Sequence, residues 1–161
     1  NCEFVKSLPE KIRKKTEIRI YPKADYGYEQ VRRWQDEIKE IKIDFARRTL
    51  QSKLKETKIC ISTSNTTTLL ITMAINFPTM IIWQENFWEI REEAIIFFNE
   101  LEKVGILHTN IENAKKHISE VWENVDDWWF NEDTQKCREK FCNQFAKIEK
   151  NDINFLTKFL S

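Results

Sequence analysis

The run of small polar residues from Ser62 to Thr68 is the segment whose side chains could bind an anion. It lies between two apolar stretches, "KICI" and "LLITMAI". The first turn of a helix has N–H groups without intrahelical partners and a partial positive charge, and short hydroxyl and amide side chains add hydrogen bonds to a phosphate. A single Ser, Thr or Asn is enough to cap a helix, so a capped polar loop is the alternative. The length of the run favours a phosphate site.

Further polar and aromatic residues follow neighbouring predicted strands. Arg19 and Tyr21 stand at the end of "EIRIY", and Glu89 and Arg91 follow "TMIIW". Ligands of open parallel sheets bind outside the carboxyl ends of the strands, so we expect these residues to line one rim with the polar run. The alternatives are a surface charge with a buried stem for Arg19, and charges at a helix start for the other two.

The elements that must position these residues alternate between strand and helix. Apolar spacing predicts strands at residues 17–21, 41–45, 58–62, 79–83 and 106–108, and helices at 28–38, 46–57, 67–75 and 88–105, with Gly105 at the helix C-terminal cap. Such alternation implies right-handed crossovers in a parallel sheet. We therefore predict an α/β fold: a Rossmann-like parallel sheet flanked by helices, with a helical C-terminal third at about 111–161.

Composition excludes several classes of protein. The chain has 161 residues, a size typical of one domain, and its 26 Lys and Arg balance 26 Asp and Glu, so no basic surface indicates nucleic acid as a partner. The four cysteines form no disulfide or metal pattern with His108 and His117, and unpaired thiols fit a cytoplasmic protein. No stretch has the length of a transmembrane segment, and no signal peptide is visible.

The segment "WENVDDWW" allows two interpretations. Trp122, Trp128 and Trp129 could stack on a base or a sugar, but large aromatic residues at helical spacing more often belong to a core or an interface. Asp126 and Asp127 could suggest a metal, although adjacent acids near a helix end are usually solvated. The sequence favours packing for the tryptophans and predicts no metal site.

Several stretches together resemble a known family. They are "IRIYPKADYGYEQVRRW", "ISTSNTTTLLITMAINFPTMIIW", "WEIREEA", "VGILH" and "VWENVDDWW". They are similar to the C-terminal part of bacterial transferases associated with surface-carbohydrate gene clusters, from about Phe4 to the last helices. More broadly, they resemble the donor-binding half of GT-B glycosyltransferases. The chain departs from the family pattern at Ile71, where related enzymes often have a glutamate, and at Ser64, where an aromatic residue is common.

The resemblance implies roles for individual residues. It makes a phosphate-contacting turn of Ser62, Thr63, Asn65, Thr66 and Thr67. It also places Arg19 and Tyr21 beside the nucleotide sugar from the neighbouring strand end, and Glu89 and Arg91 from the following loop. It identifies no catalytic residue in this chain and calls for no metal and no cofactor, because the nucleotide sugar is the substrate.

The same resemblance implies a function. Residues 1–161 would form a C-terminal donor-binding domain, a fragment of a two-domain glycosyltransferase-like enzyme of surface-polysaccharide biosynthesis. Its partners would be a nucleotide-sugar donor, a carbohydrate acceptor and a missing N-terminal domain that carries the general base, so the isolated chain should be inactive. The location would be cytoplasmic, including the inner face of the membrane. The alternatives are another nucleotide-sugar enzyme, such as an epimerase, and a non-catalytic module that binds a partner through its helical tail.

Overall fold

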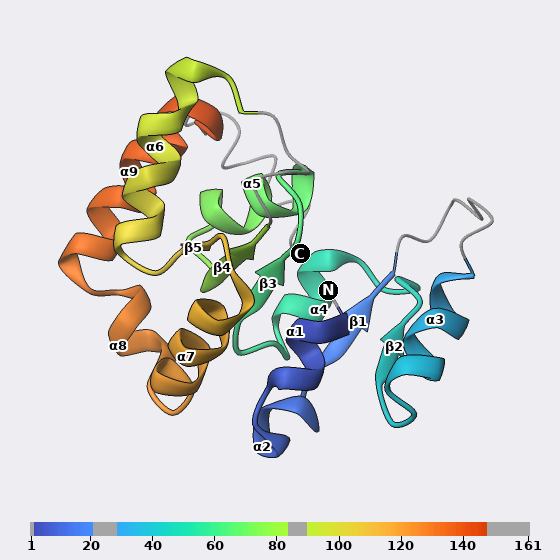
Figure 1. The fold of residues 1–161 in the computed structure, drawn as a ribbon. Coiled ribbons are helices and arrows are strands. Elements are labelled where there is room, and N and C mark those ends of the chain that lie inside the picture. Colours follow the sequence, from blue (N-terminus) through green and yellow to red (C-terminus); the bar gives the residue numbers. More distant parts are fainter. Residues whose placement is uncertain (1, 21–28, 84–89, 148–161) are drawn as a thin grey trace. The chain divides into compact units, whose positions relative to one another are not determined.

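The chain folds into two compact units, Asn1–Glu56 and Thr57–Ser161. Their elements are drawn in Figure 1, from a computed structural model that describes residues 2–20, 29–83 and 90–147. The boundary between the two units follows Glu56, and the prediction of one donor-binding domain over 1–161 stays a prediction. Tyr21 and Glu89, two of the predicted site residues, lie outside the described residues.

The N-terminal unit combines a two-stranded parallel sheet with short helices. The strands pair in register, with Ile18 opposite Ile43 and Arg19 opposite Asp44. Pro9 stands at the N-cap of the second helix, where its missing N–H leaves no helical hydrogen bond unmade. The elements are α1 (Cys2–Ser7), α2 (Glu10–Arg13), β1 (Glu17–Arg19), α3 (Gln30–Glu37), β2 (Lys42–Asp44) and α4 (Leu50–Leu54).

The C-terminal unit has a three-stranded parallel sheet in the order β3-β4-β5. Ile61 pairs with Met80, and Ile81 pairs with Leu107, so strands separated by a helix lie side by side. This pairing confirms the predicted parallel arrangement of β3 and β4. The elements are β3 (Cys60–Ser62), α5 (Thr67–Ala74), β4 (Thr79–Ile82), α6 (Glu92–Lys103), β5 (Leu107–His108), α7 (Ile111–Val121), α8 (Val125–Trp129) and α9 (Glu132–Phe145).

Two features of the predicted fold need correction. The described strands form two sheets, because β1 pairs with β2, whereas the sequence prediction placed residues 17–21 in one sheet with 58–62 and 79–83. Apolar periodicity identifies strands but not the strands with which they pair. The two sheets also differ in burial, because β1 alternates between exposed and half-buried residues whereas β4 is buried at every position. The helix predicted at 46–57 is also shorter, because Thr49 caps it by accepting a hydrogen bond from the Ser52 N–H. The helical C-terminal third is confirmed over residues 111–145.

The core of the C-terminal unit surrounds β4. Met80 and Ile81 are fully buried, and α6 and α9 lie side by side in Figure 1. Between these helices the Phe98 and Phe141 rings meet edge to face, with their centroids 5.4 Å apart. Trp129 is also fully buried, and its Nε1 donates to the Asn76 side-chain oxygen at 2.9 Å. Trp129 therefore packs in the core, as the sequence analysis favoured.

Gly105 ends α6 in a left-handed conformation, which confirms its predicted position. Its φ is +76°, its N–H donates to the Glu102 carbonyl, and the N–H of Ile106 donates to the Leu101 carbonyl at 2.9 Å. This pair of bonds is a Schellman motif. A Cβ built on Gly105 would lie 2.4 Å from Cε1 of His117, so the imidazole ring packs directly on the glycine. Backbone conformation and packing both require glycine here.

We predict that Gly105→Ala lowers the free energy of unfolding by about 2 kcal/mol or more, because the methyl group adds a clash to the left-handed strain. Denaturant unfolding of wild type, Gly105→Ala, His117→Ala and the double variant separates the two causes. Removing the imidazole should recover the part due to the clash and leave the part due to strain. Strict additivity of the two single substitutions would show that the imidazole does not press on this position.

Candidate functional site

The polar run follows β3 at the carboxyl end of the strand, as the sequence predicted. The strand ends at Ser62 and α5 begins at Thr67, so the intervening turn leads directly into the helix. The Ser62 side chain is buried, and its Oγ donates to the Ser64 carbonyl at 2.7 Å. Ser62 thus stabilises the turn from within. The exposed members of the predicted set are Thr63, Asn65, Thr66 and Thr67.

The start of α5 is not capped in the usual way. Thr66 occupies the N-cap position in an extended conformation, but its side chain makes no capping hydrogen bond. Its Oγ1 lies 2.9 Å from the Ser64 Oγ instead. By contrast, the N-cap side chains of Thr49 and Asn110 accept hydrogen bonds from Ser52 N and Asn113 N. The initial N–H groups of α5 therefore keep their capacity to bind an acceptor from outside the helix.

Arg91 lies at the same edge of this sheet as the turn. It is the N-cap residue of α6, which follows β4, and its side chain is exposed. The first turn of α6 contains Glu92 and Glu93, which suit the partial positive charge of a helix N-terminus. Arg91 is thus available to an anion at the carboxyl edge, with two carboxylates beside it in the sequence.

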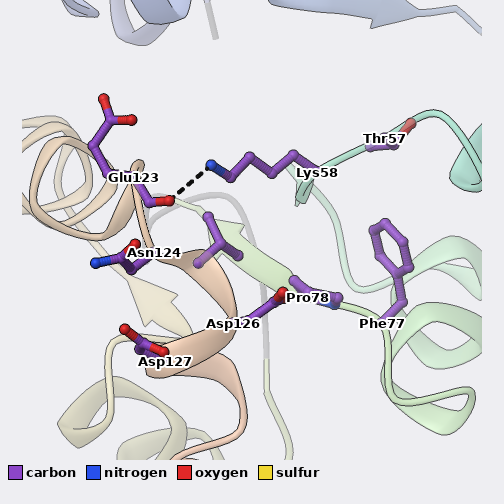
Figure 2. Close-up of a pocket in the computed structure, with 9 residues that line it drawn as sticks. Thr57, Lys58, Phe77, Pro78, Glu123, Asn124, Asp126 and Asp127 are labelled. Atoms are coloured by element: carbon purple, nitrogen blue, oxygen red, sulfur yellow. Dashed lines mark hydrogen bonds between the residues drawn. The ribbon is translucent and has the colours of Figure 1, made fainter.

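A separate cavity of about 460 Å³ lies at the opposite edge of the sheet. Its walls include Lys58, just before β3, and Pro78, just before β4, together with residues at the start of α8 (Figure 2). The Lys58 ammonium donates to the Glu123 carbonyl at 3.1 Å and lies 5.2 Å from the centre of the Trp122 ring. Sequence reasoning did not identify this cavity, because a single sequence does not show that α8 starts beside the amino ends of the strands.

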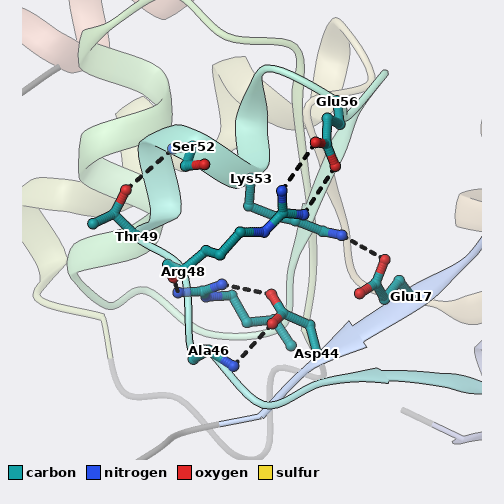
Figure 3. A network of polar contacts seen from close by, with 9 residues as sticks. Glu17, Asp44, Ala46, Arg48, Thr49, Ser52, Lys53 and Glu56 are labelled. Carbon is teal, nitrogen blue, oxygen red and sulfur yellow. Dashed lines mark hydrogen bonds and ion pairs between the residues drawn. The ribbon is translucent and has the colours of Figure 1, made fainter. Parts of the chain in front are cut away.

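Arg19 belongs to the N-terminal unit, where it is held by two acceptors. Its Nη1 donates to Oδ2 of Asp44 at 2.5 Å, and its Nη2 donates to the Arg48 carbonyl at 2.8 Å. Asp44 also accepts a hydrogen bond from the N–H of Ala46, which has a left-handed φ of +52° (Figure 3). These contacts fix the guanidinium at the carboxyl end of β1. They leave other N–H donors of the guanidinium for a further acceptor.

Ion pairs around Arg19 tie the remaining parts of this region together. The Arg48 guanidinium forms two 2.9 Å bonds with the Glu56 carboxylate, and Lys53 pairs with Glu17 at 2.6 Å (Figure 3). The sequence analysis did not identify Asp44 as the partner of Arg19. The β1–β2 register places Arg19 opposite Asp44. A single sequence does not show this register, because it does not show which strands pair.

His108 ends β5 and packs against His117. His108 is almost fully buried, its Nε2–H donates to the Gly105 carbonyl at 3.0 Å, and the two ring centroids are 5.0 Å apart. Burial lowers the pKa of both imidazoles, and that of His117 falls to about 4, with the charge of His108 as the second cause. The Nε2 of His117 is buried and has no hydrogen-bond partner among the described residues. Both rings are therefore neutral at pH 7 and form part of the packing.

Further features of the described residues concern reactive thiols, metal ligands and membrane-spanning helices. Burial raises the pKa of the Cys60 thiol in β3 to about 11, so this cysteine is not a thiolate nucleophile at pH 7. Within 2–20, 29–83 and 90–147, no group of three or more His, Cys, Asp or Glu residues is placed to hold a metal ion. No helix in these ranges has both the length and the apolar character needed to cross a membrane.

Comparison with known proteins identifies a family. The family model described as "LIC12162 family transferase" matches residues 1–160, which is nearly the whole chain. No curated protein and no solved structure matches the sequence of this chain.

We predict that Thr66→Val and Thr49→Val differ in their effects on stability. Thr49→Val removes a capping hydrogen bond and should lower the free energy of unfolding by about 1 kcal/mol. Thr66→Val removes no capping bond and should cost less than half of that. Thermal or denaturant unfolding of the two variants tests this difference. Equal losses would show that Thr66 stabilises α5 as an ordinary cap.

We also predict that the histidine pair makes the protein less stable in acid. His117 has a folded pKa of about 4, below its ordinary value of 6.5, so its contribution to stability is complete above about pH 6.5. That contribution is lost as the pH falls toward 4, because the unfolded state binds the proton more readily. The free energy of unfolding should therefore fall less between about pH 7 and pH 4.5 in His117→Gln than in wild type. Parallel curves for the two proteins would contradict the prediction.

Proposed function

The chain belongs to the LIC12162 transferase family, and from this premise we propose that it is the donor-binding part of a glycosyltransferase-like enzyme. The enzyme would transfer a sugar from a nucleotide sugar to a carbohydrate acceptor in bacterial surface-polysaccharide biosynthesis, in the cytoplasm or at the inner face of the membrane. The chain would act as a Rossmann-like half of a GT-B architecture. A second domain would carry the acceptor site and the general base, so the chain alone should be inactive.

The turn before α5 is the observation that carries this proposal. It lies at the carboxyl end of β3, and its N-cap side chain leaves the first N–H groups of the helix uncapped. Thr63, Asn65 and Thr67 are exposed around it. A phosphate would find backbone N–H donors, the partial positive charge of a helix start and short hydroxyl groups together.

The chemistry of sugar transfer suits such a site. As the bond between the anomeric carbon and the phosphate oxygen breaks, negative charge develops on the leaving nucleotide diphosphate. Donors already fixed by the fold stabilise that charge without reorganising during the reaction. The turn supplies fixed backbone donors. Arg19, whose guanidinium is held by Asp44 within the N-terminal unit, stays a predicted contact of the donor. Arg91 would add a second, more mobile cation.

The two alternatives receive less support from the described residues. An epimerase would need a catalytic acid or base in this part of the enzyme, but the candidate His108 is buried with its Nε2–H committed to the Gly105 carbonyl. A non-catalytic partner-binding module would need an exposed aromatic surface near residues 122–130. Trp129 is fully buried there, and Phe130 is the large apolar side chain of this segment that is exposed.

We predict that Thr66→Val and Arg19→Ala each weaken binding of the preferred nucleotide diphosphate to the intact protein. The loss should be about 1 kcal/mol or more in each case, because each substitution removes a hydrogen bond to phosphate, charge-assisted for Arg19. Isothermal titration with UDP, GDP, CDP, ADP and dTDP first identifies the preferred nucleotide and then compares the variants.

Thr49→Val and Arg48→Ala are the matched controls. The first removes a threonine cap elsewhere in the chain, and the second removes the pair with Glu56 but keeps the carbonyl that binds Arg19. Neither should change the affinity for the nucleotide. If the intact protein binds a nucleotide and both test substitutions leave its affinity unchanged, the turn is only the start of a helix and the proposed site is wrong.

A further inference from the structure

We propose that the cavity at the amino ends of β3 and β4 binds an uncharged pyranose unit of a glycan. The cavity has a volume of about 460 Å³, within the range typical of small-molecule sites. It lies in the C-terminal unit at the edge of the sheet opposite the polar turn. The proposal therefore adds a carbohydrate contact beyond the donor site and does not depend on nucleotide binding.

The charge of the lining argues against an anionic ligand. Asp126 and Asp127 provide carboxylates at the cavity, and Lys58 provides the ammonium group, which already donates to the Glu123 carbonyl. Two negative charges against one positive charge disfavour a phosphate, so this cavity is not a second site for a nucleotide or a sugar phosphate. The ligand is neutral or cationic.

The mixture of donors and acceptors favours a polyol over a simple cation. The Asp126 and Asp127 carboxylates line the cavity and can accept hydrogen bonds from hydroxyl groups. The Lys58 ammonium donates to the Glu123 carbonyl and retains further N–H donors. A sugar ring bears hydroxyl groups that both donate and accept hydrogen bonds. An ammonium or guanidinium ligand only donates, so the Lys58 donors could not bind it.

Asn124 supplies an amide that the local fold does not use. It is the N-cap residue of α8, but its side chain makes no capping hydrogen bond. The N-cap asparagines of α7 and α9 do cap: Asn110 accepts from Asn113 N, and Asn131 accepts from Asp133 N. The Asn124 amide, with one acceptor oxygen and an NH₂ donor, is thus available to a ligand at the wall of the cavity.

An apolar wall completes the site. Pro78 and Val125 are buried and Phe77 is half-buried, and all three line the cavity. In Figure 2, Lys58 reaches across from the start of β3 to the turn before α8, while Pro78 faces the first residues of that helix. The C–H face of a pyranose can pack on such apolar groups while its hydroxyl groups reach the carboxylates and the amide.

Saturation-transfer NMR of the intact protein tests the proposal, with the methyl pyranosides of glucose, galactose, mannose and N-acetylglucosamine as probes. At least one should bind saturably, and short oligosaccharides of the same sugar should show whether a single unit or a longer chain is recognised. Replacing both Asp126 and Asp127 by Asn should weaken binding by about tenfold, because hydrogen bonds to charged acceptors are lost. Lys58→Met should weaken it as well.

Asp133→Asn is the matched control, because Asp133 also lies in the first turn of a helix but does not line the cavity. It should leave pyranoside binding unchanged. Circular dichroism first verifies that each variant is folded, and Asn124→Ala provides a second, milder test of the wall. Two results would overturn the proposal: no pyranoside binds saturably, or binding is the same in all variants. Saturable binding of spermidine without any pyranoside would also overturn it and identify a cation site. Failure of nucleotide binding alone would reject the donor site and not this one.

Discussion

The burial of β4 between β3 and β5 is the constraint on which the C-terminal unit depends. Every residue of β4 is buried, and its neighbours on both sides run parallel to it. Parallel strands need a crossover between them, and here α5 and α6 provide it while covering the apolar strand. The crossovers bring the carboxyl ends of all three strands to one edge. The polar turn, Arg91 and His108 are located at that edge for this reason.

The same packing gives the two edges different chemistry. At the carboxyl edge, helices α5 and α6 begin, so N–H groups and partial positive charge face outward. At the amino edge, α5 ends at Ala74. Asn76, which follows it, has a left-handed backbone, and its side-chain oxygen accepts a hydrogen bond from Trp129. The buried guanidinium of Arg138 donates to the Met73 carbonyl near the same helix end. These hydrogen bonds pair polar groups at the end of α5 with side chains of α8 and α9. The start of α8 is thereby held at the amino edge, where its carboxylates line the cavity.

Much of this arrangement could be predicted from the sequence, because the signals are local. Apolar runs bounded by turn residues predicted the strands, and Gly105 predicted the end of α6. The length of the polar run predicted the turn that follows Ser62. Pairing is not local. The sequence did not show that β1 pairs with β2, and so it missed Asp44 as the partner of Arg19. The cavity was missed for the same reason, since Lys58 and Asp126 line one cavity only because the chain after α7 lies at the amino edge.

Arg19 illustrates how the structure changes the interpretation of a residue that the sequence singled out. An arginine with a carboxylate 2.5 Å away contributes less net positive charge to a site than a free one. However, the Asp44 carboxylate and the Arg48 carbonyl also remove most of its rotational freedom, so less entropy is lost when it binds a further acceptor. A guanidinium of reduced charge binds the intact donor only weakly. Because it is already fixed in position, it can stabilise negative charge that develops on a ligand during a reaction. In the function proposed above, that property would suit stabilisation of a leaving diphosphate better than strong binding of the intact donor.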